Sequence, residues 1–378
     1  MRLLLSLDGP LLEVFADDGE AAASNLVVLG TGPVTMTLDT EWHGPISVTV
    51  ADVNQAEASA PPSSGERPTP DVLVVGEALV DVVHRADGSI DESPGGSPAN
   101  VALALGRLGR RPRLLTSLGE DAHGRTVRAW LEASDVVLEG APAARTSTAI
   151  AHLDALGAAS YEFAIDWQIE SDGVEAADAL HVGSIAATLE PGAAAVAALV
   201  DRHRGRALIS YDPNIRPSLI DDSASVRRRV LSLVERADVI KASDEDVAWL
   251  HPGERIEDVA QRWLRSGPSL VVVTLGSEGC LALAPGLEVR LPAVIVDVVD
   301  TVGAGDTFMA ALIDGLLSEG AFGIRARNVL ESLGEERLTS LLQRSAIAAA
   351  ITVSRPGADP PTGSELEADI LPAEALAR

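Results

Sequence analysis

The stretch between residues 293 and 317 constrains the fold more than any other part of the chain. A short apolar run from Ala293 to Val299 predicts a buried strand. A Gly-Ala-Gly turn follows at 303–305, and apolar residues then recur at helical spacing from Thr307 to Leu317. The sequence therefore predicts a strand, a tight turn and a helix in immediate succession.

The turn between this strand and this helix has the composition of an anion site. Backbone N–H groups that open a helix and the helix dipole both favour negative charge. The amides of Gly303, Ala304 and Gly305 can stabilise charge on a phosphoryl group. Asp306 lies beside them and can act as a general base. The alternative is an ordinary turn in which Asp306 caps the helix, because Asp is a favoured N-cap residue.

The composition argues against several classes of protein. The 378 residues are 46% apolar and only 3% aromatic, so a large core must be built mostly from Ala, Leu and Val. The formal net charge of −27 argues against a nucleic-acid partner and against an anionic membrane surface. No apolar run approaches the ~18 residues of a membrane span. We therefore expect neither nucleic acid nor membrane among the partners.

Cysteine usage and the N-terminus favour a cytoplasmic location. Cys280 is the only cysteine, so no intrachain disulfide can form, which fits a reducing compartment. Its apolar neighbourhood predicts a buried structural thiol and not a nucleophile. The first eight residues lack a long apolar core and a small-residue cleavage site, and we expect no signal peptide.

Residues 1–53 differ in pattern from the rest of the chain. Short alternating segments such as Leu11–Phe15 and Ile46–Val50, separated by turn residues, predict a short all-β appendage. Residues 54–70 are rich in Pro and Ser and predict an exposed linker. A second domain would then span 71–378.

The segment Leu11–Glu20 resembles a strand-turn-strand motif in the C-terminal β-sandwich of family 32 glycoside hydrolases, the invertases and levanases. The catalytic propeller of that family is missing, so the resemblance implies no hydrolase activity. An unrelated β appendage or a partly disordered extension is the alternative.

From Asp71 onward, strand and helix patterns alternate. Such alternation predicts a mostly parallel sheet that helices cover on both faces. The expected strands are 72–76, 113–118, 176–182, 207–211, 239–240 and 270–275. The expected helices are 99–108, 190–202, 223–236, 244–250 and 256–265.

Two segments have a different pattern. Residues 78–83 and 149–163 alternate apolar and polar side chains, and the turns Asp87-Gly88 and Leu156-Gly157 accompany them. These features predict antiparallel strands outside the main sheet, as a small lid would need.

Groups that could hold a polyol lie around the first helix of this domain. The paired glycines Gly95 and Gly96 let the backbone approach a ligand closely. Asn100 offers a donor and an acceptor to hydroxyl groups, and Asp81 offers a bidentate acceptor for a vicinal diol. The alternative is an ordinary turn, because glycines often precede a helix.

Three further segments follow strands, which is where ligands bind in open α/β sheets. Arg216 can hold a phosphate or a hydroxyl group, or can be the exposed side chain of a Pro-rich turn. Asp246 can orient hydrated Mg²⁺, or can complete a capping box with Ser243. The turn at 274–279 can give backbone donors to a nucleotide, or can be a hairpin turn.

Two common phosphate-binding motifs are missing from the sequence. There is no G-x-x-x-x-G-K-[ST] loop, which excludes a P-loop kinase. Gly76 follows the first strand of the domain but is continued by Glu77-Ala78, so the glycine pattern of a dinucleotide oxidoreductase is not formed.

Together these segments resemble the ribokinase/PfkB family of carbohydrate kinases, from about Asp71 to Pro361. The motifs that carry the resemblance lie at 76–81, 94–100, 212–217, 300–306 and 353–358. The first three look most like those of the fructokinases. The resemblance implies an α/β fold, a ribokinase-like three-layer αβα sandwich with a small β lid.

The resemblance also implies roles for individual residues. Asp306 would deprotonate the sugar hydroxyl, and Gly303, Ala304 and Gly305 would form the anion hole. The sugar would be held by Asp81, Gly95, Gly96, Asn100 and Arg216. ATP would lie against Lys241, Ser243, Thr274, Gly276 and Gly279. Mg²⁺ would be oriented through water by Asp246, and a monovalent cation, usually K⁺, would be bound by Asp300, Val302, Thr352 and Gly357.

The chain departs from the family pattern at two places. The family's Asn-x-x-Glu motif appears here as Ser243 followed three residues later by Asp246, which weakens the Mg²⁺ and phosphate assignments. Ribokinases carry Lys after the paired glycines, whereas this chain has Ser97, which disfavours ribose.

The expected activity is ATP-dependent phosphorylation of a sugar hydroxyl, with fructose as the favoured sugar and a homodimer formed through the lid. The same-family alternative is a kinase for 2-keto-3-deoxygluconate or another sugar. The alternative from another class is a catalytically silent sugar-binding module. The Asp306 turn argues against it, because a pure binder has no need of a base.

Overall fold

The computed structural model describes residues 3–8, 11–16, 22–26, 69–85, 88–153 and 159–368. The chain divides into two compact units, Met1–Gly65 and Glu66–Arg378. The described strands of the first unit are β1 (Leu3–Asp8), β2 (Leu11–Ala16) and β3 (Ala22–Leu26), which form an antiparallel sheet in that order. The strand expected at Leu11–Phe15 is therefore present as β2, whereas Ile46–Val50 lies outside the described residues.

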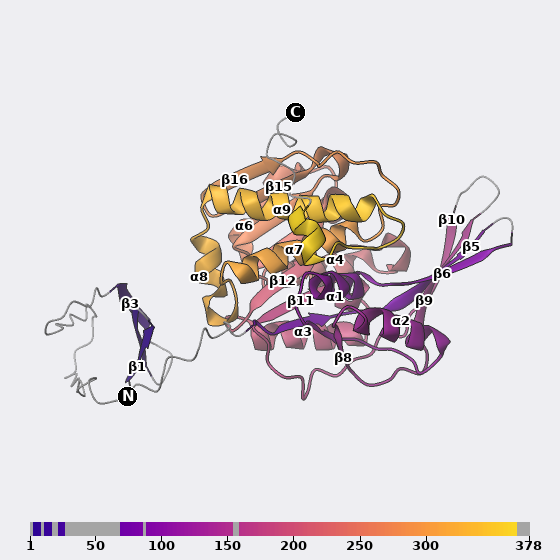
Figure 1. Cartoon of the computed structure of the whole chain (residues 1–378), viewed down its shortest axis with the longest axis horizontal. Coiled ribbons are helices and arrows are strands. Elements are labelled where there is room, and N and C mark those ends of the chain that lie inside the picture. Colours follow the sequence, from indigo (N-terminus) through magenta and orange to yellow (C-terminus); the bar gives the residue numbers. More distant parts are fainter. Residues whose placement is uncertain are drawn as a thin grey trace, which may run out of the picture. The chain divides into compact units, whose positions relative to one another are not determined.

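A mixed sheet forms the centre of the second unit (Figure 1). Within the described residues its order is β16-β15-β14-β13-β12-β11-β4-β7-β8. The bounds are β4 (Val72–Val75), β7 (Arg113–Leu115), β8 (Val137–Glu139), β11 (Ala179–Gly183), β12 (Leu208–Asp212), β13 (Val239–Ser243), β14 (Leu270–Thr274), β15 (Cys280–Ala284) and β16 (Leu287–Leu291). Pairing is parallel from β14 to β8 and antiparallel at β15 and β16.

Helices cover both faces of this sheet, and a large hydrophobic cluster lies on each face. A third, smaller cluster consists of Ala311, Ile347, Ala348, Ile351 and Leu366. One face carries α1 (Ser97–Arg107), α2 (Ala122–Glu132), α7 (Ala304–Ser318), α8 (Ala326–Glu331) and α9 (Glu335–Val353). The other face carries α3 (Gly192–His203), α4 (Ser223–Val234), α5 (Asp244–Leu250) and α6 (Ile256–Ser266). Short 3₁₀ turns lie at η2 (Ile185–Ala187), η3 (Pro217–Leu219), η4 (Gly276–Glu278) and η5 (Gly323–Arg325), and α10 (Gly363–Ala368) ends the described chain.

A second sheet projects from this body and forms the lid (Figure 1). Its described strands are β5 (Leu79–His84), β6 (Ile90–Gly95), β9 (Ser147–Leu153) and β10 (Ala159–Ala164), in the order β10-β9-β5-β6. The lid is present where the alternating pattern predicted it. Its pairing is not purely antiparallel, because β5 and β9 run parallel to one another. The crossover between them passes through α1 and the β7 and β8 strands of the main domain, which leaves the two strands pointing the same way.

The buried strand predicted at Ala293–Val299 is wrong. Residues 292–298 have no regular structure, and Ile295 and Val298 expose 89% and 65% of their surface. The chain leaves the edge strand β16 at Leu291 and must travel to the start of α7, so the connection overrides the local strand preference. In the described residues this segment joins its surroundings by backbone bonds from Val299 and Asp300 to the Val353 carbonyl, at 2.8 and 3.2 Å.

Within the described residues, no single helix is both long and apolar enough to cross a membrane. The helix α7 passes such a test only when it is joined to residues 323–331 across a 99° bend, by length and composition alone.

Candidate active site

The strand order places a topological switch point beside β4. From β4 the chain builds outward to β7 and β8 on one side and, later, to β11, β12 and β13 on the other. Ligands bind at such a point, outside the carboxyl ends of the strands. Backbone strain gathers there as well. Ser184, which follows β11, has a φ of 53°, and Asn214, which follows β12, has a φ of 38°.

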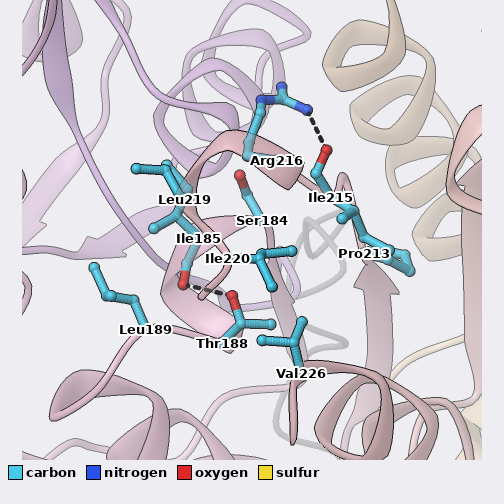
Figure 2. A pocket seen from close by; sticks show the side chains of 10 residues that line it. All are labelled: Ser184, Ile185, Thr188, Leu189, Pro213, Ile215, Arg216, Leu219, Ile220 and Val226. Atoms are coloured by element: carbon cyan, nitrogen blue, oxygen red, sulfur yellow. Dashed lines mark hydrogen bonds between the residues drawn. The ribbon is translucent and has the colours of Figure 1, made fainter. Parts of the chain in front are cut away.

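A small cavity lies behind this edge, between the turn after β11 and the 213–220 loop (Figure 2). Its volume is about 40 Å³, which is enough for water but too small for a sugar. The floor is apolar and includes Leu189 and Val226, whereas the Arg216 guanidinium lies on the opposite side (Figure 2). Arg216 is exposed and donates to the side-chain oxygen of Asn214 at 2.6 Å. Burial raises the pKa of both Asp81 and Glu77, and the charge of Arg216 opposes that rise.

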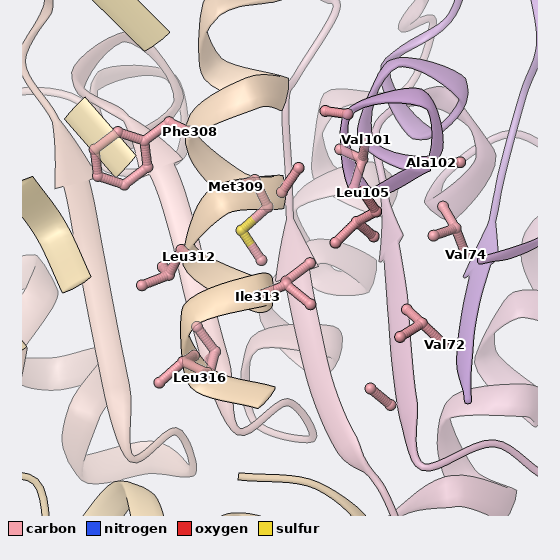
Figure 3. Close-up of a cluster of buried hydrophobic side chains, with 14 of the residues drawn as sticks. Val72, Val74, Val101, Ala102, Leu105, Phe308, Met309, Leu312, Ile313 and Leu316 are labelled. Atoms are coloured by element: carbon pink, nitrogen blue, oxygen red, sulfur yellow. The ribbon is translucent and has the colours of Figure 1, made fainter. Parts of the chain in front are cut away.

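The helix α7 is the rigid support of the site. Met309, Leu312, Ile313 and Leu316 pack against α1 and the sheet and are at most 1% exposed (Figure 3). Burial of each such side chain stabilises the fold by ~1.5–3 kcal/mol. This packing fixes the position of the helix N-terminus, where the turn predicted from the sequence lies.

Asp306 is the third residue of α7, and it does not cap the helix. The N-cap residue is Gly303, with a φ of 76° and no side-chain cap. The Asp306 carboxylate is 7% exposed and accepts two hydrogen bonds from the first turn of α1. Ser97 Oγ donates to Oδ1 at 2.6 Å, and Asn100 Nδ2 donates to Oδ2 at 2.8 Å. The carboxylate therefore points toward the first turn of α1.

Steric contacts require glycine in the turn that opens α7. A Cβ on Gly303 would lie 2.6 Å from the Ala358 Cβ, and the left-handed φ would strain any other residue. A Cβ on Gly305 would lie 2.9 Å from Lys241 Nζ. The first N–H groups of a helix have no partner within the helix, so this turn can offer donors to an anion. The Ala304 N–H donates to the Thr301 carbonyl at 3.4 Å, a long bond that an anion would replace.

The paired glycines bring the α1 turn against the lid and the end of β4. A Cβ on Gly95 would lie 2.3 Å from Asp81 Oδ2, and one on Gly96 would lie 2.6 Å from the Glu77 carbonyl oxygen. Gly96 also has a φ of 105°. Burial raises the pKa of Asp81 to about 6, against the opposing charge of Arg216. The structure thus brings Asp81, Gly95 and Gly96 together as the sequence predicted.

Glu77 is a buried carboxyl that the sequence analysis did not single out. It is 3% exposed, and Oε2 accepts a hydrogen bond from the Ala186 N–H at 3.1 Å. Burial raises its pKa to about 7, although a hydrogen bond from Ser184 acts in the other direction. Its position directly after β4, at the carboxyl edge of the sheet, was the available signal.

Asp246 forms the capping box that was the structural alternative for this segment. Its carboxylate accepts from the Ser243 N–H and Oγ at 2.9 and 2.8 Å, and Ser243 Oγ accepts from the Asp246 N–H at 3.0 Å. Oδ1 also accepts from the Ile215 N–H at 2.7 Å, which ties the loop after β12 to α5. With both oxygens engaged, Asp246 fits an outer, water-mediated role toward Mg²⁺ and not direct ligation.

Lys241, in the middle of β13, and Asp212, the last residue of β12, form a buried ion pair. The distance from Lys241 Nζ to Asp212 Oδ2 is 2.7 Å, and the side chains are 5% and 1% exposed. Burial raises the pKa of Asp212 to about 6, with Lys241 acting against it. Burial alone would lower the pKa of Lys241, but the charge of Asp212, aided by Asp306 and Asp246, raises it.

The segment at 274–279 connects the antiparallel strands β14 and β15, so it is a hairpin turn. Gly276 has a φ of 54° and open space on its side-chain side. A Cβ on Gly279 would lie 1.9 Å from the Leu291 carbonyl oxygen, so this glycine is required for packing. Thr274 Oγ1 donates to the Ala242 carbonyl at 3.4 Å.

Asp300 links the two loops predicted to bind a monovalent cation. Its Oδ1 accepts from the Val302 N–H at 3.0 Å, and its Oδ2 accepts from the Gly357 N–H at 2.9 Å. Thr352 is fully buried and donates to Thr307 Oγ1 at 3.0 Å, which joins α9 to α7. A carboxylate among loop carbonyls fits a hard monovalent cation. In the described residues no cluster of three or more His, Cys, Asp and Glu side chains could hold a metal ion.

Cys280 is a buried thiol, as its neighbourhood predicted. It is 3% exposed and unpaired, and burial raises its pKa to about 11. A thiol in this state is a poor nucleophile.

A buried carboxylate at a helix N-terminus, at the switch point of a three-layer α/β fold, fits a kinase that acts on an alcohol. The profile of the pfkB family carbohydrate kinases matches residues 69–364. The chain belongs to this family, and it is a carbohydrate kinase. The family resemblance and the fold expected from the sequence are thereby confirmed.

Curated relatives and solved structures cover most of this chain. It is 33% identical to probable fructokinase-4 of Arabidopsis thaliana over 81% of this chain and 97% of that protein. It is 34% identical to a fructokinase of Rhizobium leguminosarum bv. trifolii over 71% and 85%. A double mutant of the Vibrio cholerae O395 fructokinase, solved with fructose, ADP and a potassium ion, matches with a TM-score of 0.69 and 26% identity over 80% and 99%. The ATP-bound fructokinase of Xylella fastidiosa shares the fold, with a TM-score of 0.72 and 24% identity over 79% and 98%.

Proposed function

We propose that this chain is a fructokinase that transfers the γ-phosphoryl group of ATP to a hydroxyl group of fructose. The observation that carries the proposal is the pair of hydrogen bonds from Ser97 and Asn100 to Asp306. They support a role for this buried carboxylate as the base, between the lid residues that we propose bind the sugar and the helix N-terminus that we propose binds the phosphoryl group. The relatives named as fructokinases, and the Vibrio cholerae structure with fructose, ADP and potassium, support the choice of sugar.

In this proposal the sugar binds between the lid and the first turn of α1. Asp81 accepts from neighbouring hydroxyls, and the backbone at Gly95 and Gly96 approaches the ring closely. Asn100 and Arg216 supply donors. Asp306 takes the proton of the attacking hydroxyl, which makes the oxygen a better nucleophile.

The nucleotide binds on the other side of α7. Ser243, Thr274, Gly276 and Gly279 lie against ATP, and the amides of residues 303–305 receive the charge that develops on the transferring group. Mg²⁺ supplies neutralisation of the phosphate charge, with Asp246 orienting its water shell.

A monovalent cation, K⁺ by preference, lies beside the anion hole. Asp300, the Val302 carbonyl, and the loop from Thr352 to Gly357 supply its oxygen ligands. The bonds that Asp300 makes to both loops support this assignment. The cation would hold the two loops in the arrangement that the anion hole needs.

A sugar panel tests the proposal. We expect ADP release to be fastest with fructose, and kcat/KM for fructose to exceed that for ribose and glucose by about tenfold or more, the worth of one hydrogen bond to a buried hydroxyl. A preference for 2-keto-3-deoxygluconate would agree with the family assignment but would contradict the proposal that fructose is the substrate. Fructose binding by calorimetry without turnover of any sugar would instead support a silent binding module.

The organisation of the chain is part of the proposal. We infer an appendage at 1–53, a linker at 54–70 and the kinase domain at 71–378. The division of the contacts at Gly65 and the family match from residue 69 support these bounds. A homodimer through the lid is supported by β6 and β10, which lie at the two edges of the described lid sheet. The single cysteine supports a cytoplasmic location.

A further inference from the structure

The buried ion pair stands at the point where two neighbouring strands separate. The ladder between β12 and β13 ends with the pair Tyr211 and Ile240. Asp212 and Lys241 are the next residues in each strand. Because side chains alternate between the faces of a sheet, both point toward the face that α1 and α7 cover, opposite to Tyr211 and Ile240.

The Lys241 ammonium touches the first turn of α7. It donates a hydrogen bond to the Gly305 carbonyl at 3.3 Å, and it lies 2.9 Å from the place that a Cβ of Gly305 would take. Lys241 is 4% exposed and Asp212 is fully buried, and Asp212 Oδ1 has no hydrogen-bond partner in the part of the chain that the structure describes. The pair therefore lies between the sheet and the turn proposed as the anion hole, out of contact with bulk solvent.

Burial and the helix N-terminus both oppose a cation at this location, and the neighbouring carboxylates of Asp212, Asp306 and Asp246 keep Lys241 charged. The N-terminus of a helix repels positive charge. Burial of an ion pair also carries a desolvation cost that a pair on the surface does not have. Lys241 is also the only lysine in the sequence. A pair of apolar residues would pack there at lower cost. The placement of the charge at this turn thus points to a role in catalysis.

Building on the proposed phosphoryl transfer, we propose that Lys241 and Asp212 are positioning residues for the anion hole. Lys241 holds the Gly305 carbonyl in place by its hydrogen bond. In a helix the C=O groups point toward the C-terminus and the N–H groups toward the N-terminus, so the next N–H, that of Asp306, leaves the helix end beside the amides of residues 303–305 and is directed toward the developing charge. Asp212 keeps the lysine charged and in place. The family resemblance implied that Lys241 binds ATP. In this proposal it contacts the turn from the side of the sheet and does not bind ATP.

The test compares single and double variants. Lys241→Met and Asp212→Asn each leave an unpaired buried partner and are expected to unfold at lower temperature. The double variant Lys241→Met/Asp212→Asn removes both charges, so its thermal stability should recover toward that of the wild type. The ion pair between Arg110 and Asp314 at 2.7 Å provides the control Arg110→Met/Asp314→Asn. Arg344 also pairs with Asp314 at 2.8 Å, but its side chain is 26% exposed and keeps contact with water in this variant. Asp314 lies on α7 as well, but about 12 Å farther along the helix axis at ~1.5 Å per residue.

Two readouts separate a positioning role from a structural one. We expect the double variant at 241 and 212 to lose at least about tenfold in kcat, within the ~10²–10³ that loss of one anion-hole donor costs, with KM for both substrates nearly unchanged. We also expect faster amide hydrogen exchange in a peptide that spans residues 300–310, and unchanged exchange elsewhere. The control double variant should keep the wild-type kcat and exchange at the turn.

Recovery of both stability and kcat in the double variant would overturn the proposal, and so would unchanged exchange at the turn. The kinetics use the sugar that the wild type turns over fastest, so an error in the choice of fructose does not affect them. If the wild type turns over no sugar, the proposed function fails, and the exchange experiment alone decides whether Lys241 and Asp212 hold the turn.

Discussion

Single side chains in this protein are positioned by contacts between residues that lie far apart in the sequence. Ser97 and Asn100 reach Asp306 across more than two hundred residues. Three carboxyls at the site, those of Glu77, Asp81 and Asp212, have pKa values that burial raises. Such a concentration of perturbed carboxyls is typical of a functional site.

Glu77 gives a pH-dependent stability that can be measured. Its pKa rises from 4.5 to about 7 because the folded chain buries it. The folded state therefore favours the protonated form, and stability is highest below pH 4.5 and falls as the pH rises through 7. The shift corresponds to about 3 kcal/mol. The difference in unfolding free energy, Glu77→Gln minus wild type, should thus be about 3 kcal/mol larger at pH 8 than at pH 4.5.

Urea unfolding at several pH values checks this expectation, because titration of all other groups cancels in the difference. Glu132→Gln, on an exposed position of α2, controls for the loss of one charge. A difference that stays constant with pH would show that Glu77 is not the buried carboxyl described here.

Among single residues, those that belong to a recognisable sequence motif could be predicted from the sequence. Asp306, Asn100, Asp81 and the paired glycines lie together as expected. The hydrogen bond from Ser97 to the base could not be predicted, because it depends on how α1 packs against α7. The ion pair of Lys241 was missed for a similar reason, since strand order decides which residues become neighbours.

Elements that follow a strong local pattern were predicted well. The helix α5 begins and ends at the expected residues, 244 and 250, and β14 differs from its expected range by one residue. The run at 293–299 was misread because it belongs to the exposed connection between β16 and α7. Local preference has little weight where the chain must link an edge strand to a helix.

The loops joined by Asp300 should respond as one unit to the monovalent cation. We expect the wild-type rate to be higher in K⁺ than in Na⁺ or tetramethylammonium. Asp300→Ala removes the acceptor of the Val302 and Gly357 N–H groups, so kcat in K⁺ should fall by about tenfold and the dependence on the cation should disappear.

Steady-state rates in the three chloride salts at constant ionic strength test this expectation. Asp222→Ala is the control, because Asp222 caps α4 by bonds to Ala224 and Ser225 and lies outside the site. It should lose ~1 kcal/mol of stability and keep the cation response. Equal wild-type rates in all three salts would remove the cation from the mechanism.

The chain as a whole consists of two units, and the family match begins in the second. A shortened chain that begins at Pro70 should therefore keep kcat and KM within about twofold, since units joined by a linker of the kind predicted at 54–70 behave independently. Assay of the shortened and full chains side by side checks this. An aggregated or inactive shortened chain would make residues 1–69 part of the kinase fold or of its oligomer.

The central claim is that Asp306 transfers a proton from fructose while ATP phosphorylates it. The most direct measurement is the rate of fructose phosphate formation by the wild type and by Asp306→Asn, with fructose and ATP affinities measured by calorimetry. The account predicts fructose phosphate from the wild type, a rate lower by ~10²–10⁴ in the variant, and nearly unchanged affinities. A variant that keeps more than about half of the wild-type rate would contradict the account, because a general base contributes far more than a factor of two.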